Sequence, residues 1–193
     1  MKIEARWGKK SFSTILEHKI TVVVGDSGTG KTTIANALKS HNTLVTTTND
    51  AEIVVLTEEI FRRELKHLKR YVKLKHPDLD LNRESLDQKY YEEIWGDTDF
   101  APYTNSIIVV DAENFVRTHE FAIMVNCDKT NHYLFFLRDH LSNINYNIDA
   151  VKVLIEENGN YFLEQAFKPE YTHEYSDKNL IIVEGENKIT VTA

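Results

Sequence analysis

One short stretch of the sequence has the residue types needed to hold a chain of phosphates. Residues 25–32 read GDSGTGKT and match the pattern G-x-x-x-x-G-K-[ST] at every fixed position. The glycines allow tight turns that point several backbone N–H groups toward one anion. The lysine supplies a positive charge for the β- and γ-phosphates, and the last hydroxyl is a ligand for Mg²⁺. This spacing therefore predicts a site for a nucleoside triphosphate and Mg²⁺.

The flanks of the loop fit the same prediction. Residues 19–24 (KITVVV) form a β-branched apolar run typical of a buried strand, and residues 31–40 have the composition of a helix whose positive N-terminal end would face the anion. We expect Lys31 to act in catalysis and to be exposed in an open loop, and Thr32 to bind the metal. The predicted nucleotide contacts are Gly25, Asp26, Ser27, Gly28, Thr29, Gly30, Lys31, Thr32 and Thr33.

A carboxylate on the other side of the metal is expected at the end of a second buried strand. Asp111 follows the apolar run 107–110 (IIVV) and is our candidate metal ligand. The alternative is a strand-terminal Asp that caps the next helix. We expect strands 20–24 and 107–110 to end side by side in one sheet, with residues 133–137 (YLFFL) next to them.

Two further residues are catalytic candidates. Glu113 stands two positions after Asp111, and it is either a general base for the attacking water or a first-turn acid favoured by a helix dipole. Arg138 follows the run 133–137 and is a candidate sensor of the γ-phosphate. A surface ion pair between Arg138 and Asp139 is the alternative, and it is the simpler interpretation.

Composition bounds the class of protein. The chain has 193 residues, 41% of them hydrophobic, which suits one domain, or one domain with a small appendage. Cys127 is the one cysteine, so an intrachain disulfide framework is excluded. No apolar run is long enough for a transmembrane helix, and the first residues lack the apolar stretch of a signal peptide. We expect a cytoplasmic protein that does not bind a membrane.

The pattern of elements predicts an α/β fold. Apolar strands alternate with helices at 31–40, 58–75, 86–95 and 115–127, and two more strands are expected at 43–48 and 52–56. Strands are also expected at 151–156, 161–165, 180–183 and 188–192, with Asn158-Gly159 as a hairpin turn. We predict a mainly parallel sheet in a nucleotide-binding domain, residues 1–147, with a β-rich C-terminal extension, residues 148–193, in the same domain.

The helix predicted at residues 58–75 is amphipathic and basic. Between residues 62 and 75 it has seven Lys or Arg side chains and one acid, although the chain as a whole has a net charge of −7. This charge has three interpretations. The helix binds nucleic acid, or it is a lid that brings Arg to a bound phosphate, or it is a solvated face balanced by the acidic segment after Pro77.

The loop at residues 25–32, together with Asp111, resembles the P-loop NTPase superfamily over about residues 1–145. The order of elements looks most like ATPases with AAA-type or ABC-type cores, and the strands before Lys19 are similar to those of ABC- and RecF-like ATPases. Ala112 stands where many of these enzymes have their water-activating glutamate. The chain lacks an LSGGQ-like signature and an N-K-x-D motif, so the resemblance implies ATP rather than GTP.

A second resemblance concerns residues 180–186 (LIIVEGE), which look like the first strand and acidic turn of a Toprim domain. Overcoming-lysogenization-type nucleases join an ATPase to such a domain. The alternative, which we favour, is that residues 184–187 form an ordinary hairpin turn.

Three classes of function follow. The first is an ATPase that works as a switch or motor module, on nucleic acid or in phage defence. The second is a small-molecule or polynucleotide kinase with residues 58–75 as its lid. The third is a nucleotide-binding regulatory protein with little turnover. All three use ATP and Mg²⁺, and all three leave open whether the protein is an oligomer.

Overall fold

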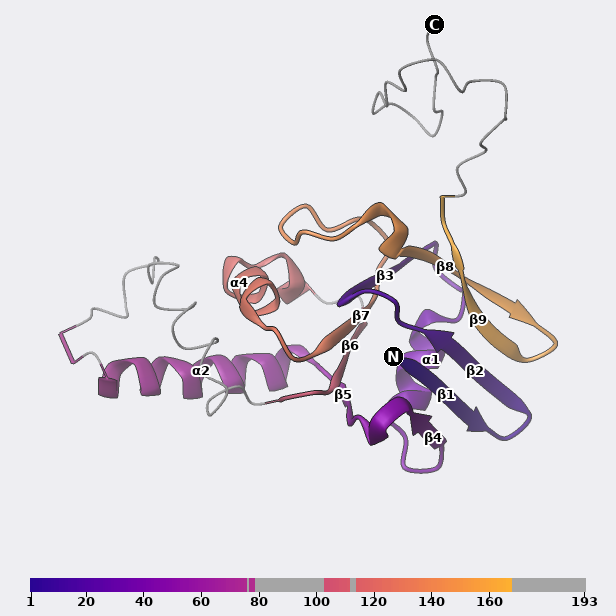
Figure 1. Ribbon diagram of the computed structural model, residues 1–193, viewed down its shortest axis with the longest axis horizontal. Coiled ribbons are helices and arrows are strands. Elements are labelled where there is room, and N and C mark those ends of the chain that lie inside the picture. The colour runs from indigo at the N-terminus through magenta and orange to yellow at the C-terminus, as the bar shows by residue number, and fades with distance from the viewer. Residues whose placement is uncertain (76, 79–102, 112–113, 168–193) are drawn as a thin grey trace, which may run out of the picture.

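The computed structural model describes residues 1–75, 77–78, 103–111 and 114–167, which form one nine-stranded sheet and three α-helices (Figure 1). The strands are β1 (Lys2–Trp7), β2 (Lys10–Ile15), β3 (Ile20–Val24), β4 (Leu44–Thr47), β5 (Ile53–Val55), β6 (Ile107–Asp111), β7 (His132–Phe136), β8 (Val151–Glu157) and β9 (Asn160–Gln165). The helices are α1 (Lys31–Lys39), α2 (Glu58–Lys75) and α4 (His119–Cys127), and short 3₁₀ turns occupy Thr48–Asp50, Asn114–Arg117 and Ile148–Ala150.

The sheet is mixed, so the prediction of a mainly parallel phosphate-binding core with a β-rich extension is wrong. Its strand order is β4-β1-β2-β9-β8-β3-β7-β6-β5, and it curls into a half-barrel. At the start of the chain β1 pairs antiparallel with both β2 and β4, and β8 pairs antiparallel with β9. Continuous apolar runs reveal only strands that are buried on both faces. Strands with one solvated face leave a weaker signal, and they pair antiparallel through short turns.

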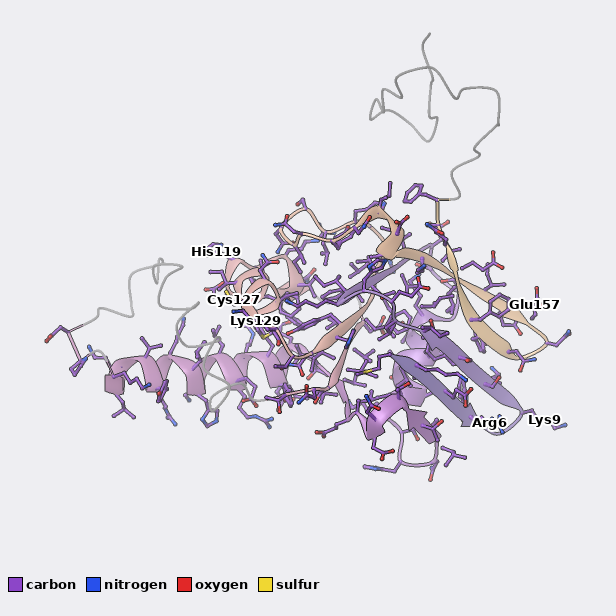
Figure 2. The ribbon with its side chains drawn as sticks, in the orientation of Figure 1. Arg6, Lys9, His119, Cys127, Lys129 and Glu157 are labelled. Carbon is purple, nitrogen blue, oxygen red and sulfur yellow. The ribbon has the colours of Figure 1, made fainter. Side chains whose placement is uncertain are left out.

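The hairpin predicted at Asn158-Gly159 is confirmed. Both residues have positive φ, 53° and 83°, which matches the turn type favoured between two twisted strands. This hairpin lies beside the β1–β2 hairpin, because β9 pairs parallel with β2 and the Ser11 N–H donates to the Gly159 carbonyl at 3.0 Å. Figure 2 shows Lys9 and Glu157 at the adjacent ends of the two hairpins. The C-terminal hairpin is therefore part of the same sheet as the first strands.

The three apolar strands lie in one sheet, but in a different order from the expected one. β7 lies between β3 and β6 and pairs parallel with both of them, and β8 covers the other edge of β3. The expected direct contact between strands 20–24 and 107–110 is therefore absent from the described sheet. A continuous apolar run indicates burial on both faces, and it does not say which of three such strands is central.

The helices follow their sequence signals closely. The predictions at 31–40 and 58–75 are confirmed as α1 and α2, and the prediction at 115–127 is a 3₁₀ turn followed by α4, which Thr118 caps. None of the described helices is long and apolar enough to cross a membrane. The helix predicted at 86–95, the strands at 180–183 and 188–192, and the Toprim-like stretch 180–186 lie outside the described residues.

Two apolar clusters cover the two faces of the sheet. Alternation along β6 and β7 sends Ile108 and Phe135 to one face and Val109 and Leu134 to the other. The first cluster packs against α2 and α4, where the Phe61 and Phe115 rings stack at 5.0 Å and Phe121 meets both edge-on. The second packs against α1 and the inner faces of β1 and β2. The ends of β3 and β6 are therefore held between two packed layers.

A buried polar network joins the starts of the central strands. Asp128 accepts hydrogen bonds from the Tyr133 hydroxyl and the Asn131 side-chain amide, both at 2.6 Å, and from the Thr130 N–H at 2.8 Å. The Asn131 carbonyl oxygen in turn accepts from the Ser106 N–H at 2.8 Å, just before β6. Burial alone would raise the pKa of the Asp128 carboxyl. The hydrogen bonds outweigh that effect and hold its pKa below the usual value.

The same network reaches α4 through Lys19. The Lys19 ammonium donates to the carbonyl oxygens of Val125, at 2.5 Å, and of Asp128, at the C-terminal end of α4. These carbonyls lack partners within the helix, and a cation at this end also suits the helix dipole. Burial lowers the pKa of Lys19, and Asp128 and Cys127 oppose that shift.

Replacement of Asp128 tests this network. Asp128→Asn should lower the free energy of unfolding by about 2 kcal/mol at pH 7, because an amide cannot accept all of these hydrogen bonds. A carboxyl whose folded pKa is lowered contributes stability above its unfolded pKa, about 4, and loses it as pH falls through the folded pKa. The wild type and the variant should therefore converge in acid.

Urea unfolding between pH 7 and pH 2 measures the difference. Asp139→Asn is the control, because the Asp139 side chain is 82% exposed and 3.9 Å from its partner, Arg117. A gap between wild type and Asp128→Asn that does not change with pH would contradict the role assigned to this carboxylate.

Candidate nucleotide site

The predicted phosphate loop joins a buried strand to a helix, as expected from its sequence. β3 is buried up to Val23, and α1 begins at Lys31, directly after Gly30. Gly28 and Gly30 have φ values of 87° and 94°, in the left-handed region that favours glycine. Ile34 donates the first hydrogen bond of the helix to the Gly30 carbonyl, at 3.0 Å. The N-terminal end of α1 therefore lies where the loop ends.

Lys31 is buried, which corrects the expectation that it would be exposed in an open loop. Its exposed fraction is 7%. The ammonium donates to the carbonyl oxygens of Gly25, at 2.5 Å, and Asp26, at 2.8 Å, and to the Thr29 hydroxyl, at 3.0 Å. An ammonium has three protons, so all three are used within the loop. These three hydrogen bonds pull the loop around the ammonium, so Lys31 holds the loop in its curled conformation.

The charges around Lys31 come from three separate elements. Burial lowers the pKa of Lys31, while the carboxylates of Asp111 and Asp26 raise it and the Arg138 guanidinium adds to the lowering. The strand register places Asp111 of β6 level with Phe136 of β7, and Phe136 level with Val23 of β3, so the ends of β6 and β7 lie at the same edge of the sheet as the start of the loop.

Asp111 ends β6 in a position that leaves part of its carboxylate without a partner. It is level with Phe136 of β7, which is itself level with Val23 of β3. Its Oδ1 atom is buried and has no hydrogen-bond partner among the described residues. A buried carboxylate oxygen of this kind is costly unless a cation or a donor reaches it.

Arg138 lies just beyond β7 and is exposed. The ion pair expected between Arg138 and Asp139 is not formed in the described part of the chain. Asp139 instead lies 3.9 Å from Arg117, which comes from the 3₁₀ turn before α4. The Arg138 guanidinium therefore has no ion-pair partner among the described residues, and its charge acts on Lys31.

The remaining predicted site residues divide into three groups. The first turn of α1 exposes Thr32 and Thr33, so their hydroxyl groups are accessible. The exposed part of the loop contains Asp26, Ser27, Gly28 and Thr29, and the Thr29 hydroxyl also donates to the Asp26 carbonyl at 3.1 Å. Glu113 and Ala112 lie outside the described residues.

Tyr161 of β9 supports the loop, and sequence reasoning missed it. A methyl group added at Gly30 would lie 2.9 Å from the Tyr161 ring, closer than carbon atoms approach one another. The Trp7 ring of β1 stacks on the Tyr161 ring, with the two ring centroids 6.0 Å apart. Gly30 is therefore needed both for its φ and for a close approach. The alternation of β9 indicates that Tyr161 faces inward, but not what it touches.

The residues at this site fit a triphosphate with a divalent cation. The Asp111 carboxylate, whose Oδ1 atom has no partner among the described residues, and the Thr32 hydroxyl are oxygen ligands of the kind that Mg²⁺ prefers. The part of the chain that the structure describes has no cluster of three or more His, Cys, Asp or Glu residues able to hold a metal. No family model matches the chain, and no curated protein or solved structure matches it either.

Glycine replacements separate the two reasons for Gly30. Gly28→Ala has only the strain of positive φ, about 1–2 kcal/mol, because nothing lies within 4 Å of the added methyl group. Gly30→Ala should lower the free energy of unfolding by at least about 1 kcal/mol more, through the clash with Tyr161. Adding Tyr161→Leu to Gly30→Ala should recover part of that excess in a double-mutant cycle. Equal losses for the two glycine variants in urea unfolding would refute the Tyr161 contact.

Proposed function

We propose that this chain binds Mg–ATP in the loop at residues 25–32 and that it hydrolyses the nucleotide as an ATPase. The observation that supports this most directly is that a buried ammonium, Lys31, feels the charge of a carboxylate, Asp111, which has a buried oxygen without a hydrogen-bond partner among the described residues. An anion could accept a hydrogen bond from the Lys31 ammonium, and a cation could bind the Asp111 carboxylate, so a ligand with both charges would satisfy both side chains. Mg²⁺ bound to a triphosphate brings such a pair of charges in one ligand.

Each group has a definite role in this proposal. Lys31 exchanges its contacts with loop oxygens for contacts with phosphate oxygens, and the N–H groups at the start of α1 point to the same anion. Thr32 and Asp111 would hold the metal. Mg²⁺ neutralises charge on the β- and γ-phosphates when it is bound. Arg138 is exposed and acts on Lys31, so it is the residue that we assign to the γ-phosphate.

The proposal of hydrolysis is supported by the sequence more than by the geometry of the site. The general base in this proposal is Glu113, which belongs to the residues that the structure does not describe. The loop and Asp111 resemble those of P-loop NTPases in sequence, although the sheet is not their mainly parallel core, and the resemblance favours ATP over GTP. A cytoplasmic location, where Mg–ATP is plentiful, agrees with this function.

A nucleotide-binding titration followed by phosphate release tests the proposal. Binding of ATP that requires Mg²⁺, with release of phosphate, is the expected result. Binding without release would instead indicate a regulatory protein, and transfer of the γ-phosphate to an added acceptor would indicate a kinase. Absence of binding to ATP and GTP at millimolar nucleotide would refute the proposal as a whole.

Lys31→Met should weaken Mg–ATP binding at least about tenfold, because it removes a charge-assisted contact to phosphate and keeps an unbranched side chain that is one atom shorter. Titration calorimetry measures the affinity. Lys39→Met, at the exposed end of the same helix, is the control and should bind as wild type does. The variant also loses three contacts within the loop, so urea unfolding must accompany the titration. A folded Lys31→Met protein with wild-type affinity would remove the loop from the proposal.

Asp111→Asn should raise the Mg²⁺ concentration needed for half-maximal turnover several-fold, because it keeps the shape of the side chain and removes its charge. The stability of the free protein should change little, because Asn removes two opposing effects of the charge: a buried oxygen without a partner among the described residues, and the attraction of Asp111 to Lys31. Mg²⁺ titration and urea unfolding measure the two effects. An unchanged Mg²⁺ requirement together with lower stability would make Asp111 a structural residue.

A further inference from the structure

The basic side chains of α2 gather on one face of the helix. With 3.6 residues per turn, Arg62, Lys66, Lys69 and Lys73 follow one line along the helix, and Arg63 and Arg70 lie beside it. All of these positions except Lys69 are exposed, and Lys69 is half-exposed. We call Arg62, Arg63, Lys66, Lys69, Arg70 and Lys73 the basic face.

The apolar side chains of α2 show which way the basic face is turned. Phe61, Leu68 and Val72 are buried and belong to the apolar cluster that also contains Phe115 and Phe121 of the α4 region. The basic face is on the other side of the helix, turned from this cluster. Figure 1 shows α2 extending outward from the sheet, well away from α1.

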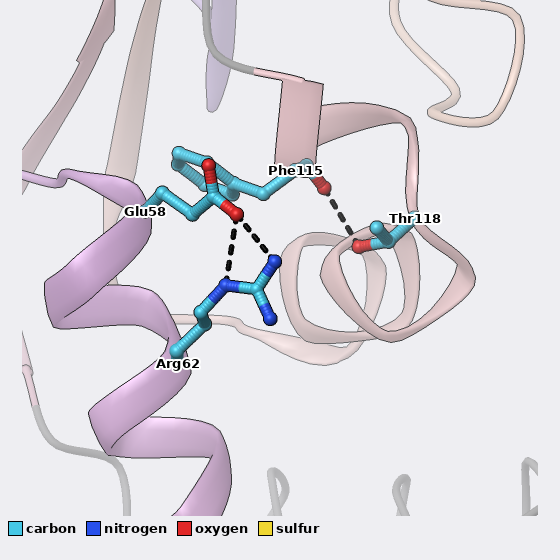
Figure 3. A network of polar contacts seen from close by, with 4 residues as sticks. All are labelled: Glu58, Arg62, Phe115 and Thr118. Carbon is cyan, nitrogen blue, oxygen red and sulfur yellow. Dashed lines mark hydrogen bonds and ion pairs between the residues drawn. The ribbon is translucent and has the colours of Figure 1, made fainter.

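The structure divides the basic face into paired and unpaired cations. Figure 3 shows Arg62 donating to Glu58 of the same helix, at 2.8 and 2.5 Å. Arg63 donates to Glu64 at 3.1 Å, and Lys73 donates to the Pro77 carbonyl at 2.6 Å. Lys66, Lys69 and Arg70 make no hydrogen bond or ion pair with the described residues. Within the described part of the chain, no direct partner neutralises these three charges.

We propose that the basic face of α2 binds the phosphodiester backbone of duplex DNA. A helix of 18 residues is about 27 Å long, and a DNA duplex presents about one negative charge for every 1.7 Å of its axis over that length. A row of cations of this length can face several of these phosphates. The whole chain has a net charge of −7, whereas the basic face is positive. The rest of the chain should therefore repel DNA, and the basic face should attract it.

The side chains on this face favour a duplex over a single strand. Single strands are held mainly by aromatic rings on which the bases stack. The Phe and Tyr rings of α2 are not exposed: Phe61 is buried, and Tyr71 is half-buried with the Lys75 ammonium 4.9 Å from its centre. The contacts are thus with phosphates, and the binding does not depend on base sequence.

This surface is separate from the nucleotide site. None of the side chains of α2 is among the charges that shift the pKa of Lys31, and the helix extends away from α1. The lid role considered for residues 58–75 therefore has no support in the described contacts. DNA binding and nucleotide binding can be measured independently, and either can fail while the other holds.

The decisive variant replaces the three unpaired cations: Lys66→Gln, Lys69→Gln and Arg70→Gln together. Glutamine keeps the helix propensity and removes the charge. The binding of a labelled 30-base-pair duplex, measured by fluorescence anisotropy at 50 and 150 mM salt, should weaken at least about tenfold at the lower salt. The slope of log K against log salt should become shallower by about 2 to 3, because each phosphate contact contributes about 0.9.

The control variant changes the net charge by the same amount elsewhere. It combines Lys9→Gln, Lys39→Gln and Lys129→Gln, three exposed lysines outside α2, two of which are labelled in Figure 2. This variant should bind DNA within about twofold of the wild type. Arg62→Gln should weaken binding less than Lys66→Gln does, because Glu58 already neutralises Arg62.

Several results would overturn the proposal. They are no binding by the full chain at 50 mM salt, equal losses in the test and control variants, and tighter binding of the single strand than of the duplex. Circular dichroism establishes that each variant is folded. If the triple variant is unfolded, the single variants Lys66→Gln and Arg70→Gln are tested instead. The proposal is rejected if both bind DNA with the affinity and the salt slope of the wild type.

Discussion

The burial of one positive charge organises the site. An ammonium removed from water needs a partner for each proton, and Lys31 finds three oxygens within its own loop. Two of these oxygens belong to the main chain, so the loop must curl until the carbonyls of Gly25 and Asp26 face inward. That curl requires positive φ at Gly28 and Gly30. The glycine spacing in the sequence is thus a consequence of where the lysine charge lies.

The rest of the sheet supports this arrangement from both ends of the chain. β7 separates β3 from β6 and brings Asp111 level with the end of β3. On the other side, β9 pairs with β2 and presents Tyr161 to Gly30, so a residue about 130 positions later limits the loop. The mixed topology is what permits this, because an antiparallel hairpin returns the chain to the edge of β2.

Local elements could be predicted from the sequence, and their pairing could not. Residues 20–24, 58–75 and 107–110 have strong patterns because burial on two faces, or on one face of a helix, constrains every residue in the run. The place of β9 beside β2 depends on which strand edges remain free after the others have paired, and alternation along residues 160–165 does not encode that. The burial of Lys31 and the contact of Tyr161 depend on such pairings, so pattern reasoning missed both.

The two cationic features of the molecule differ in how water and salt act on them. Lys31 is buried and bonded to oxygens of its own loop, so salt screens its interactions little. Lys66, Lys69 and Arg70 stand in water without partners among the described residues, where charges are screened over about 8 Å at physiological ionic strength. Rising salt should therefore weaken contacts at α2 well before it affects the loop. If the loop binds a nucleotide and α2 binds a polyanion, as proposed, a rise in ionic strength should release the polyanion first.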